Sequence, residues 1–314
     1  ERYAPTAKDL ASRDVVARAI VTEVREGRGC GPDKDYVLLK IDHLGEEVVA
    51  KRLPGIRETS KIFLGVDPAF EPIPVYPTAH YVMGGIPSDR FGRVVTPAHH
   101  GPEEVVQGLY AAGECACVSV HGANRLGGNS LLDILVFGRL SGLDILEYLD
   151  EHPRHRLTHS SSEERAMARF QRFEAEGEGV SVAELRVEFR KVMEDHAGVF
   201  RTDDIMREGV EKVKEIRRRL GDVRLHDTSR TFNTARIEAF ELENLIDVGM
   251  SIVTSALYRQ ESRGAHSRPD YPERDDRNWM RHSLYFLEED RLDYKPVRTR
   301  PLSVDSFPPK PRVY

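Results

Sequence analysis

The chain has 314 residues with a formal net charge of -6, of which 39% are hydrophobic and 31% charged. These values fit one large globular domain or two to three smaller ones with a strongly ionic surface. The mild acidity argues against nucleic acid as a main partner. Three cysteines are too few for a disulfide framework and favour a reducing compartment. No apolar run reaches the roughly 20 residues of a membrane-spanning helix, so we expect neither a transmembrane segment nor a signal peptide.

The composition changes near residue 150. Most glycines precede this point, whereas most charged residues follow it. Glycine-rich sequence lets the backbone approach a ligand closely, while charged sequence with apolar residues at helical spacing forms solvated helices. We therefore expect the chemistry to reside in the first half.

The first elements are a helix, a strand and a second helix. A helix is predicted over residues 9–26, starting near Asp9 or Ser12. A strand-like run over 38–44 and a short helix over 45–51 follow.

The stretch 67–77 is rich in proline, so it is predicted to be extended and is the best internal boundary. Short strands are predicted at 79–83, 93–96 and 109–112, separated by glycine turns. They are typical of strands that return to a sheet begun elsewhere.

The clearest helix is predicted over residues 130–150, where leucines recur at helical spacing. Ser130 and Asp133 have the spacing of a capping box at its start.

The second half reads as helical. Helices are predicted over 162–177, over 181–220 with a break near Gly198, and over 234–262. A three-helix bundle is the simplest packing for this pattern. Residues 266–314 lack periodicity except near 279–286 and are expected to wrap the outside of the fold.

A glycine-rich loop leads directly into the helix at 130–150. Asn129, Ser130 and Leu131 form its first turn, whose free N–H groups attract a phosphate, a carboxylate or an electron-rich ring such as a reduced flavin. An ordinary capped helix is the competing interpretation. Arg125, in the same loop, has a planar fork that suits a carboxylate. His80 lies beside a glycine bend, where a structural histidine is the commoner case.

Two clusters do not support a metal or redox site. His152, His155 and His159 are interrupted by proline and have few acidic neighbours, so no metal is expected there. Cys115 and Cys117 lack both the second pair of a zinc site and the two-residue spacing of a redox pair.

Several long strings identify a family resemblance. They are RYAPTAKDLASRDVV (2–16), PTAHYVMGGI (77–86), AAGEC (111–115), HGANRLGGNSLLD (121–133), ESRGAHSRPDYP (261–272) and FPPKPRVY (307–314). The chain resembles the flavoprotein subunits of the succinate dehydrogenase/fumarate reductase family over its whole length. The glycine-rich nucleotide fingerprint and the flavin-attaching histidine of that family are not in this sequence, so it resembles the carboxyl-terminal part of such a subunit.

The resemblance implies an α/β plus α fold, comprising the carboxyl-terminal part of an FAD-binding domain with a capping-domain segment, a three-helix bundle and an irregular terminal domain. The implied boundaries are 1–74 for the capping segment, 75–150 for the returning part of the FAD-binding domain, 151–265 for the helical bundle and 266–314 for the terminal domain.

The resemblance also implies roles for single residues. His80 and Arg125 would bind a dicarboxylate, and Arg13 would exchange the proton at the substrate carbon, although position alone would make Arg13 an ordinary helix-start arginine.

For the cofactor FAD, the resemblance implies that Glu114 hydrogen-bonds the ribose region, while Ser130 and Leu131 meet the isoalloxazine ring. The last two coincide with the helix terminus inferred above from the residues alone.

The implied activity is oxidation of succinate to fumarate, with electrons passed from FAD to an iron-sulfur subunit. Membrane-anchor subunits and a peripheral position on the cytoplasmic face of the inner (plasma) membrane are implied with it. Fumarate reductase is the nearest alternative, and an aspartate oxidase is a weaker one. A different class remains open, in which the chain by itself is a catalytically silent module that cannot hold FAD.

Overall fold

The computed structural model describes residues 2–8, 11–96, 103–154, 157–174, 177–227 and 229–310. The chain divides into two compact units, Glu1–His80 with Pro308–Tyr314 and Tyr81–Phe307. The division falls just after the proline-rich stretch. The four-part domain division expected from the resemblance remains a prediction.

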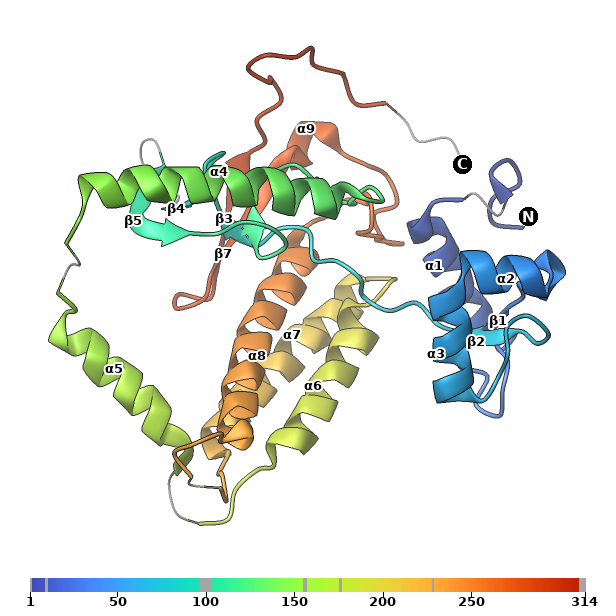
Figure 1. Ribbon diagram of the computed structural model, residues 1–314, viewed down its shortest axis with the longest axis horizontal. Coiled ribbons are helices and arrows are strands. Elements are labelled where there is room, and N and C mark those ends of the chain that lie inside the picture. Colours follow the sequence, from blue (N-terminus) through green and yellow to red (C-terminus); the bar gives the residue numbers. More distant parts are fainter. Residues whose placement is uncertain are drawn as a thin grey trace. The chain divides into compact units, whose positions relative to one another are not determined.

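The first unit combines three helices with a two-stranded antiparallel sheet. Its helices pack beside the pair β1–β2, in which Val37 lies opposite Val75 (Figure 1). In chain order the elements are α1 (Arg13–Arg25), β1 (Val37–Leu39), the 3-10 turn η2 (Asp42–Leu44), α2 (Glu46–Arg52), α3 (Pro54–Leu64) and β2 (Ile73–Val75).

The predicted helix at 9–26 is confirmed as α1, and Ser12 rather than Asp9 precedes its first residue. The helix α3 was not predicted. It begins at Pro54, whose fixed φ suits a first helical position. The stretch 67–77 is extended only in part, because the N–H groups of Phe70 and Glu71 both donate to the carbonyl of Asp67 and form a turn.

The second unit starts with four short strands in two separate pairs. β3 pairs with β6 in parallel, and β4 pairs with β5 in antiparallel orientation. Their bounds are β3 (Ile86–Pro87), β4 (Arg93–Thr96), β5 (Glu104–Tyr110) and β6 (Ala116–Cys117).

The strand prediction is confirmed at 93–96, is too late by several residues at 109–112, and is wrong at 79–83. In that last segment the N–H of Val82 donates to the Glu114 carboxylate at 3.0 Å instead of to a neighbouring strand. Pairing begins only after Gly85, where any larger residue would clash: an added Cβ would lie 2.4 Å from the Cys115 carbonyl oxygen.

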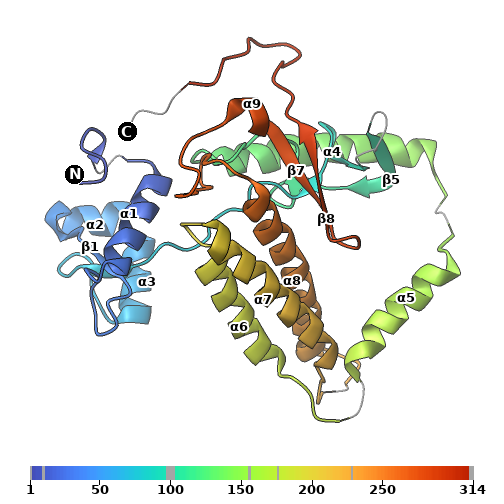
Figure 2. The ribbon, with the colours of Figure 1, turned by 180° about the vertical axis from the view of Figure 1, so that it is seen from behind.

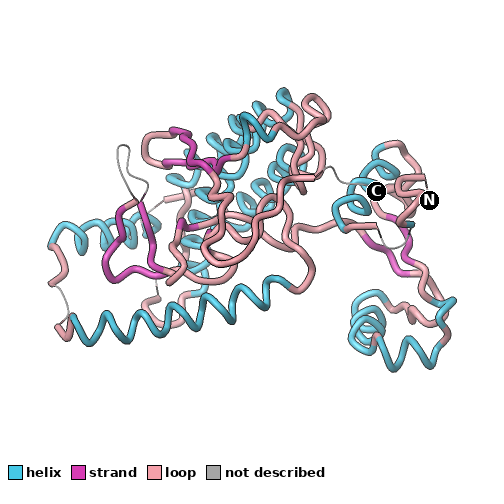
Figure 3. Tube along the Cα trace, turned by 90° about the horizontal axis from the view of Figure 1, so that it is seen from above, coloured by secondary structure: helices cyan, strands magenta, loops and turns pink. Residues whose placement is uncertain are grey.

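The long helix α4 (Asn129–Glu151) confirms the prediction at 130–150, but the predicted capping box is wrong. The cap residue is Gly128, in the left-handed conformation, and no side chain bonds to the first turn. Asp133 is buried and forms hydrogen bonds with Tyr81 and His121 instead. Figure 3 shows strands along the flank of α4. The hydroxyl of Tyr110, the last residue of β5, donates to Asp144 of α4 at 2.8 Å.

Most of the apolar stripe of α4 faces outward in this chain. Among its described residues only Asp133 and Ser141 are buried. The exposed members include Leu131, Leu132, Leu135 and Leu146.

Three helices form the main core of the second unit: α6 (Val182–Ala197), α7 (Asp203–Arg219) and α8 (Thr234–Tyr258) run side by side in both ribbon views (Figures 1 and 2). The break expected near Gly198 is confirmed, since α6 ends there. Close crossing depends on Gly209 of α7, where an added Cβ would lie 2.5 Å from the Cβ of His196.

The composition of the bundle differs from the prediction, which made the helix at 162–177 one of its three members. That segment forms α5 (Ser160–Gln171), which extends away from the bundle. The last turn of α5 contacts α8, where Arg169 donates to Glu243 and the Phe170 ring lies near that of Phe240. The third helix of the bundle arises instead from the break at Gly198. This break divides the predicted helix at 181–220 into α6 and α7, which pack against each other.

After residue 266 regular structure occurs at 276–296, which includes the stretch 279–286 that was excepted from the predicted lack of periodicity but extends beyond it on both sides. A short helix α9 (Asp276–Trp279) precedes the hairpin of β7 (Arg281–Phe286) and β8 (Arg291–Pro296). The hairpin strands have intermediate exposure throughout β7, so no alternation of buried and exposed positions marked them in the sequence.

A buried ionic network precedes this hairpin. Glu261 is fully buried and accepts from Arg259 at 2.7 Å, from Arg263 at 2.7 and 3.0 Å, and from the Asp275 N–H. Arg268 is also fully buried and donates to Asp270 and to the carbonyls that end α8.

His266 is part of the same buried region. Its Nε2 lies 3.1 Å from the Arg259 carbonyl and its Nδ1 lies 3.0 Å from Nη1 of Arg201. A carbonyl can only accept and a guanidinium can only donate, so the ring is neutral with its hydrogen on Nε2. Burial, with Arg201 nearby, lowers the pKa of His266 to about 3.

Within the described ranges, none of the helices combines the length and apolarity that crossing a membrane requires.

Candidate functional site

Tyr81, His121 and the buried Asp133 form a partly buried polar cluster in the second unit. The His121 Nε2 lies 2.8 Å from Oδ2 of Asp133 and 3.1 Å from the Tyr81 hydroxyl. That hydroxyl also donates to the same carboxylate oxygen at 3.2 Å. Because the carboxylate accepts both bonds, Nε2 carries a hydrogen. Burial, followed by the charge of Asp133, raises the pKa of Tyr81, so its hydroxyl stays a donor at neutral pH.

Two atoms of this cluster have no hydrogen-bond partner in the structure: Nδ1 of His121 and Oδ1 of Asp133. Both are buried, on side chains that are only 10% and 2% exposed. Buried polar atoms are nearly always paired in folded proteins, so such a pair of exceptions marks a place where another group belongs.

Arg125 lies against this cluster. Its guanidinium carbon is 4.7 Å from the centre of the Tyr81 ring, a cation–π distance. One terminal nitrogen donates to the Leu126 carbonyl at 3.1 Å, and Nε is buried without a partner. A partly shielded guanidinium with free hydrogen-bonding capacity suits a carboxylate ligand.

The 118–128 loop, which joins β6 to α4 and carries Arg125, is supported by distant parts of the second unit. The Ala265 N–H donates to the Ala123 carbonyl at 2.9 Å. Gly264 allows this approach, because an added Cβ would lie 2.4 Å from that same carbonyl oxygen. Ser119 Oγ and His282 Nε2 of β7 lie 2.8 Å apart. These contacts therefore fix the conformation of the loop, although it contains neither helix nor strand.

The start of α4 follows this loop and fits an apolar, electron-rich ring. The positive end of the helix dipole lies at this first turn, which has no side-chain cap, although the N–H groups of Asn129 and Leu131 donate to the carbonyls of Leu126 and Gly128. Leu131 is 64% exposed beside it. Glu114 is exposed and is oriented by the bond that it accepts from Val82. Leu131 therefore suits the flat face of such a ring, and Glu114 suits a polar chain attached to the ring.

The predicted site residues fall into two groups. Glu114, Arg125, Ser130 and Leu131 belong to the second unit, and Arg125 lies in the loop that leads into the helix start formed by the last two.

The other two predicted residues belong to the first unit. Arg13 is exposed at the first residue of α1, where its neighbour Asp14 pairs with Arg18. His80 is exposed, ends the amino-terminal segment of that unit and lies outside any strand, contrary to its expected place in one.

Other clusters have structural explanations. His152 stacks on Tyr148, and the side chain of His159 accepts from the Ser161 N–H at the start of α5, while His155 lies outside the described residues. No group of three potential metal ligands occurs within the part of the chain that is described. All three cysteines are free.

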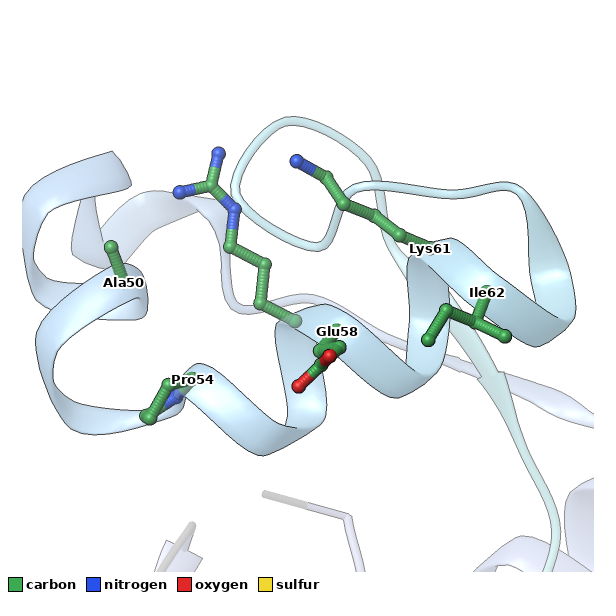
Figure 4. A pocket seen from close by; sticks show the side chains of 6 residues that line it. Ala50, Pro54, Glu58, Lys61 and Ile62 are labelled. Carbon is green, nitrogen blue, oxygen red and sulfur yellow. The ribbon is translucent and has the colours of Figure 1, made fainter.

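A shallow pocket on α2 and α3 of the first unit also lacks the features of a site. Figure 4 shows Ala50, Pro54, Glu58, Lys61 and Ile62 around it. The two cations there already have two carboxylate partners, because Arg57 pairs with Glu46 and Asp67, and Lys61 with Asp67, each at 2.7 Å.

Comparison with known proteins identifies the family of the chain. Residues 1–131 match a model of an FAD binding domain, and residues 186–314 match a model described as the fumarate reductase flavoprotein carboxyl-terminal region. A succinate dehydrogenase flavoprotein subunit of Coxiella burnetii is 52% identical over 312 residues, which cover 99% of this chain and 53% of that protein. The chain belongs to the succinate dehydrogenase and fumarate reductase flavoprotein family.

Solved structures and other members of the family extend the match. A mutant of the quinol fumarate reductase of E. coli superimposes with a TM-score of 0.84 at 38% identity, over 98% of this chain and 51% of that one. A fumarate reductase flavoprotein subunit of Mycobacterium tuberculosis is 37% identical, over 98% of this chain and 52% of that protein. The chain thus spans about half the length of the relatives that it matches.

Sequence reasoning missed Tyr81, His121 and Asp133 as a group. Two signals were present, since Tyr81 directly follows His80 and His121 lies four residues before Arg125. Neither signal shows that the three side chains meet, because Tyr81 and Asp133 are 52 positions apart.

Proposed function

We propose that this chain is part of an FAD-dependent flavoprotein subunit that oxidises succinate to fumarate and passes the electrons to an iron-sulfur subunit. Membrane-anchor subunits would complete the complex, with this subunit peripheral on the cytoplasmic face of the inner (plasma) membrane. The observation that carries the proposal is Arg125 with unused hydrogen-bonding capacity, held against a partly buried polar cluster immediately before an uncapped helix start.

The chain's own residues suit dicarboxylate binding. Arg125 would form two parallel hydrogen bonds to one substrate carboxylate, with its Nε and a terminal nitrogen as donors. His80 would bind the same substrate. Arg13 would take the proton that leaves the neighbouring substrate carbon. Because an arginine normally stays charged, we propose that Arg13 loses one proton to a relay as it gains the other.

The residues that would hold FAD are Glu114, Ser130 and Leu131. FAD, when bound, supplies an acceptor for the hydride that balances the proton taken by Arg13, so that succinate loses two electrons and two hydrogens. Glu114 would accept a hydrogen bond from the ribose region. Leu131 would cover the ring, and the N–H groups around Ser130 would stabilise negative charge that develops on it.

The similarity values favour the dehydrogenase direction. Relatives named succinate dehydrogenase flavoprotein subunit reach 52% and 50% identity, whereas those named fumarate reductase reach 37% and 38%. Fumarate reductase is the second candidate, because the same binding and proton-transfer groups serve both directions.

Two substitutions in the full-length protein test the proposal. Arg125→Ala should weaken succinate and fumarate binding by tenfold or more, because each charged hydrogen bond contributes about 1.5–3 kcal/mol. Arg13→Gln should abolish turnover and leave fumarate binding, followed by the flavin absorbance, nearly unchanged. Undiminished turnover of Arg13→Gln would disprove its role, and unchanged fumarate affinity of Arg125→Ala would disprove the substrate site.

A further inference from the structure

We propose that Tyr81, His121 and Asp133 act as one positioning unit, which holds the guanidinium of Arg125 in the orientation that binds a dicarboxylate. This inference rests on the proposed function, since it assigns a task to the surroundings of its substrate arginine. The three residues are positioning residues, because they act through Arg125.

The first argument is that stability does not account for this cluster. Asp133 is a nearly fully buried carboxylate, yet only Oδ2 accepts hydrogen bonds, while Oδ1 has no partner. His121 likewise leaves its buried Nδ1 unused. A buried carboxylate and imidazole that serve the fold alone would have their remaining atoms satisfied. An unpaired buried polar atom needs an explanation, and a functional role is one.

The second argument is the path from the cluster to Arg125. Two hydrogen bonds at the hydroxyl fix how the Tyr81 ring is turned. The face of that ring supports the guanidinium at 4.7 Å, and a planar cation over a fixed ring has few remaining orientations. The raised pKa of Tyr81 supports this path, because a phenol that stays protonated keeps donating to Asp133 over the working pH range.

The third argument is that the arginine has little other support. Its one hydrogen bond in the described structure goes to the carbonyl of the next residue, Leu126, which orients a nitrogen but does not fix the loop. His121 lies in the same 118–128 loop as Arg125, and its bond to Asp133 ties the loop to the first turns of α4. The cluster therefore controls both the ring under the guanidinium and the backbone that carries it.

The chain contains a matched control pair. The Tyr110 hydroxyl donates to Asp144 at 2.8 Å, which is another bond from a tyrosine to a carboxylate of α4. Burial raises the pKa of Tyr110 to about 12, so this pair has a comparable environment. The Tyr110–Asp144 pair lies nearer the carboxyl-terminal end of α4 than the Tyr81–Asp133 pair does, and Asp144 also forms an ion pair with Arg93.

The test uses the full-length protein with its FAD and measures the dissociation constant of fumarate from the flavin absorbance, with KM and kcat for succinate. Tyr81→Phe keeps the ring and removes the hydroxyl, and Asp133→Asn keeps the shape and removes the charge. Each should raise the dissociation constant and KM about tenfold, with a smaller change in kcat. Tyr81→Leu, which also removes the ring, should raise them further.

Tyr110→Phe and Asp144→Asn are the controls and should leave the fumarate dissociation constant within about twofold. Flavin content and melting temperature, measured for every variant, separate a loss of positioning from a loss of folding. The inference is overturned if Tyr81→Phe and Asp133→Asn bind fumarate within twofold of the unmodified protein. It is also overturned if the control pair loses affinity to the same extent.

Arg125→Lys separates this inference from the function on which it rests. If Arg125→Lys weakens fumarate binding and the cluster variants do not, the proposed function stands and the positioning unit is wrong. If Arg125→Lys binds fumarate normally, the proposed substrate site fails and the positioning unit fails with it.

Discussion

Replacing His266 by glutamine should remove an acid-sensitive contribution to the stability of this chain. The ring is buried and neutral, accepting from Arg201 and donating to the Arg259 carbonyl, and its pKa lies at about 3. The unfolded chain has the ordinary histidine pKa of 6.5. Between these values the unfolded chain binds a proton that the folded chain does not, so the free energy of unfolding falls as the pH is lowered.

The size of this effect follows from the pH interval. Each pH unit below 6.5 removes about 1.4 kcal/mol, so the loss attributable to His266 is small at pH 7 and about 2 kcal/mol at pH 5. Glutamine also carries one donor and one acceptor but does not titrate. The difference in free energy of unfolding, unmodified chain minus His266→Gln, should therefore fall by about 2 kcal/mol from pH 7 to pH 5.

The assay is urea denaturation at several pH values, followed by the fluorescence of Trp279, the chain's single tryptophan. It is well placed, since it is buried in α9 and its ring lies under Arg259. All other titrating groups are common to both proteins and cancel in the difference. A difference that stays constant between pH 7 and pH 5 would show that His266 is not held neutral.

Two further substitutions test the cores. Leu242→Ala, at a fully buried position of α8, should lower the free energy of unfolding by about 2–5 kcal/mol. The control Leu245→Ala, at a half-exposed position of the same helix, should lower it by about 1 kcal/mol or less. Equal losses for the two variants in urea denaturation would contradict the assigned core. Glu261→Gln should cost about 3–5 kcal/mol by the same measurement, because it removes the fully buried carboxylate that pairs with the partly buried Arg259 and Arg263. The exposed Glu211→Gln is its control and should change little, so a similar loss in both would refute the importance of burial.

Local patterns were enough to predict the longer helices. α1, α4, α6, α7 and α8 repeat apolar residues at helical spacing over three turns or more, and such a signal depends on neighbours in the sequence. The membership of the bundle was predicted less well. Periodicity gives the face of a helix but not its partner, so α5 was placed in a bundle from which it departs.

In the candidate site, too, local features could be predicted from the sequence and long-range contacts could not. The helix start near Ser130 and the carboxylate-binding fork of Arg125 could be inferred from a short motif. The bonds that support them join Tyr81 to Asp133, Ala265 to Ala123 and Ser119 to His282. No spacing rule predicts contacts between loops so far apart, because they depend on how the whole unit folds.

The support of the 118–128 loop also sets when it can form. Ser119 and His282 are 163 positions apart, and at usual rates of synthesis the second is made about 10–30 s after the first. Contacts of such large sequence separation carry a high entropic cost and form late. A chain halted just after Tyr258 lacks both Ala265 and His282, so it should keep the helices α6 to α8, detectable by hydrogen exchange, while the loop that carries Arg125 exchanges faster than in the whole chain.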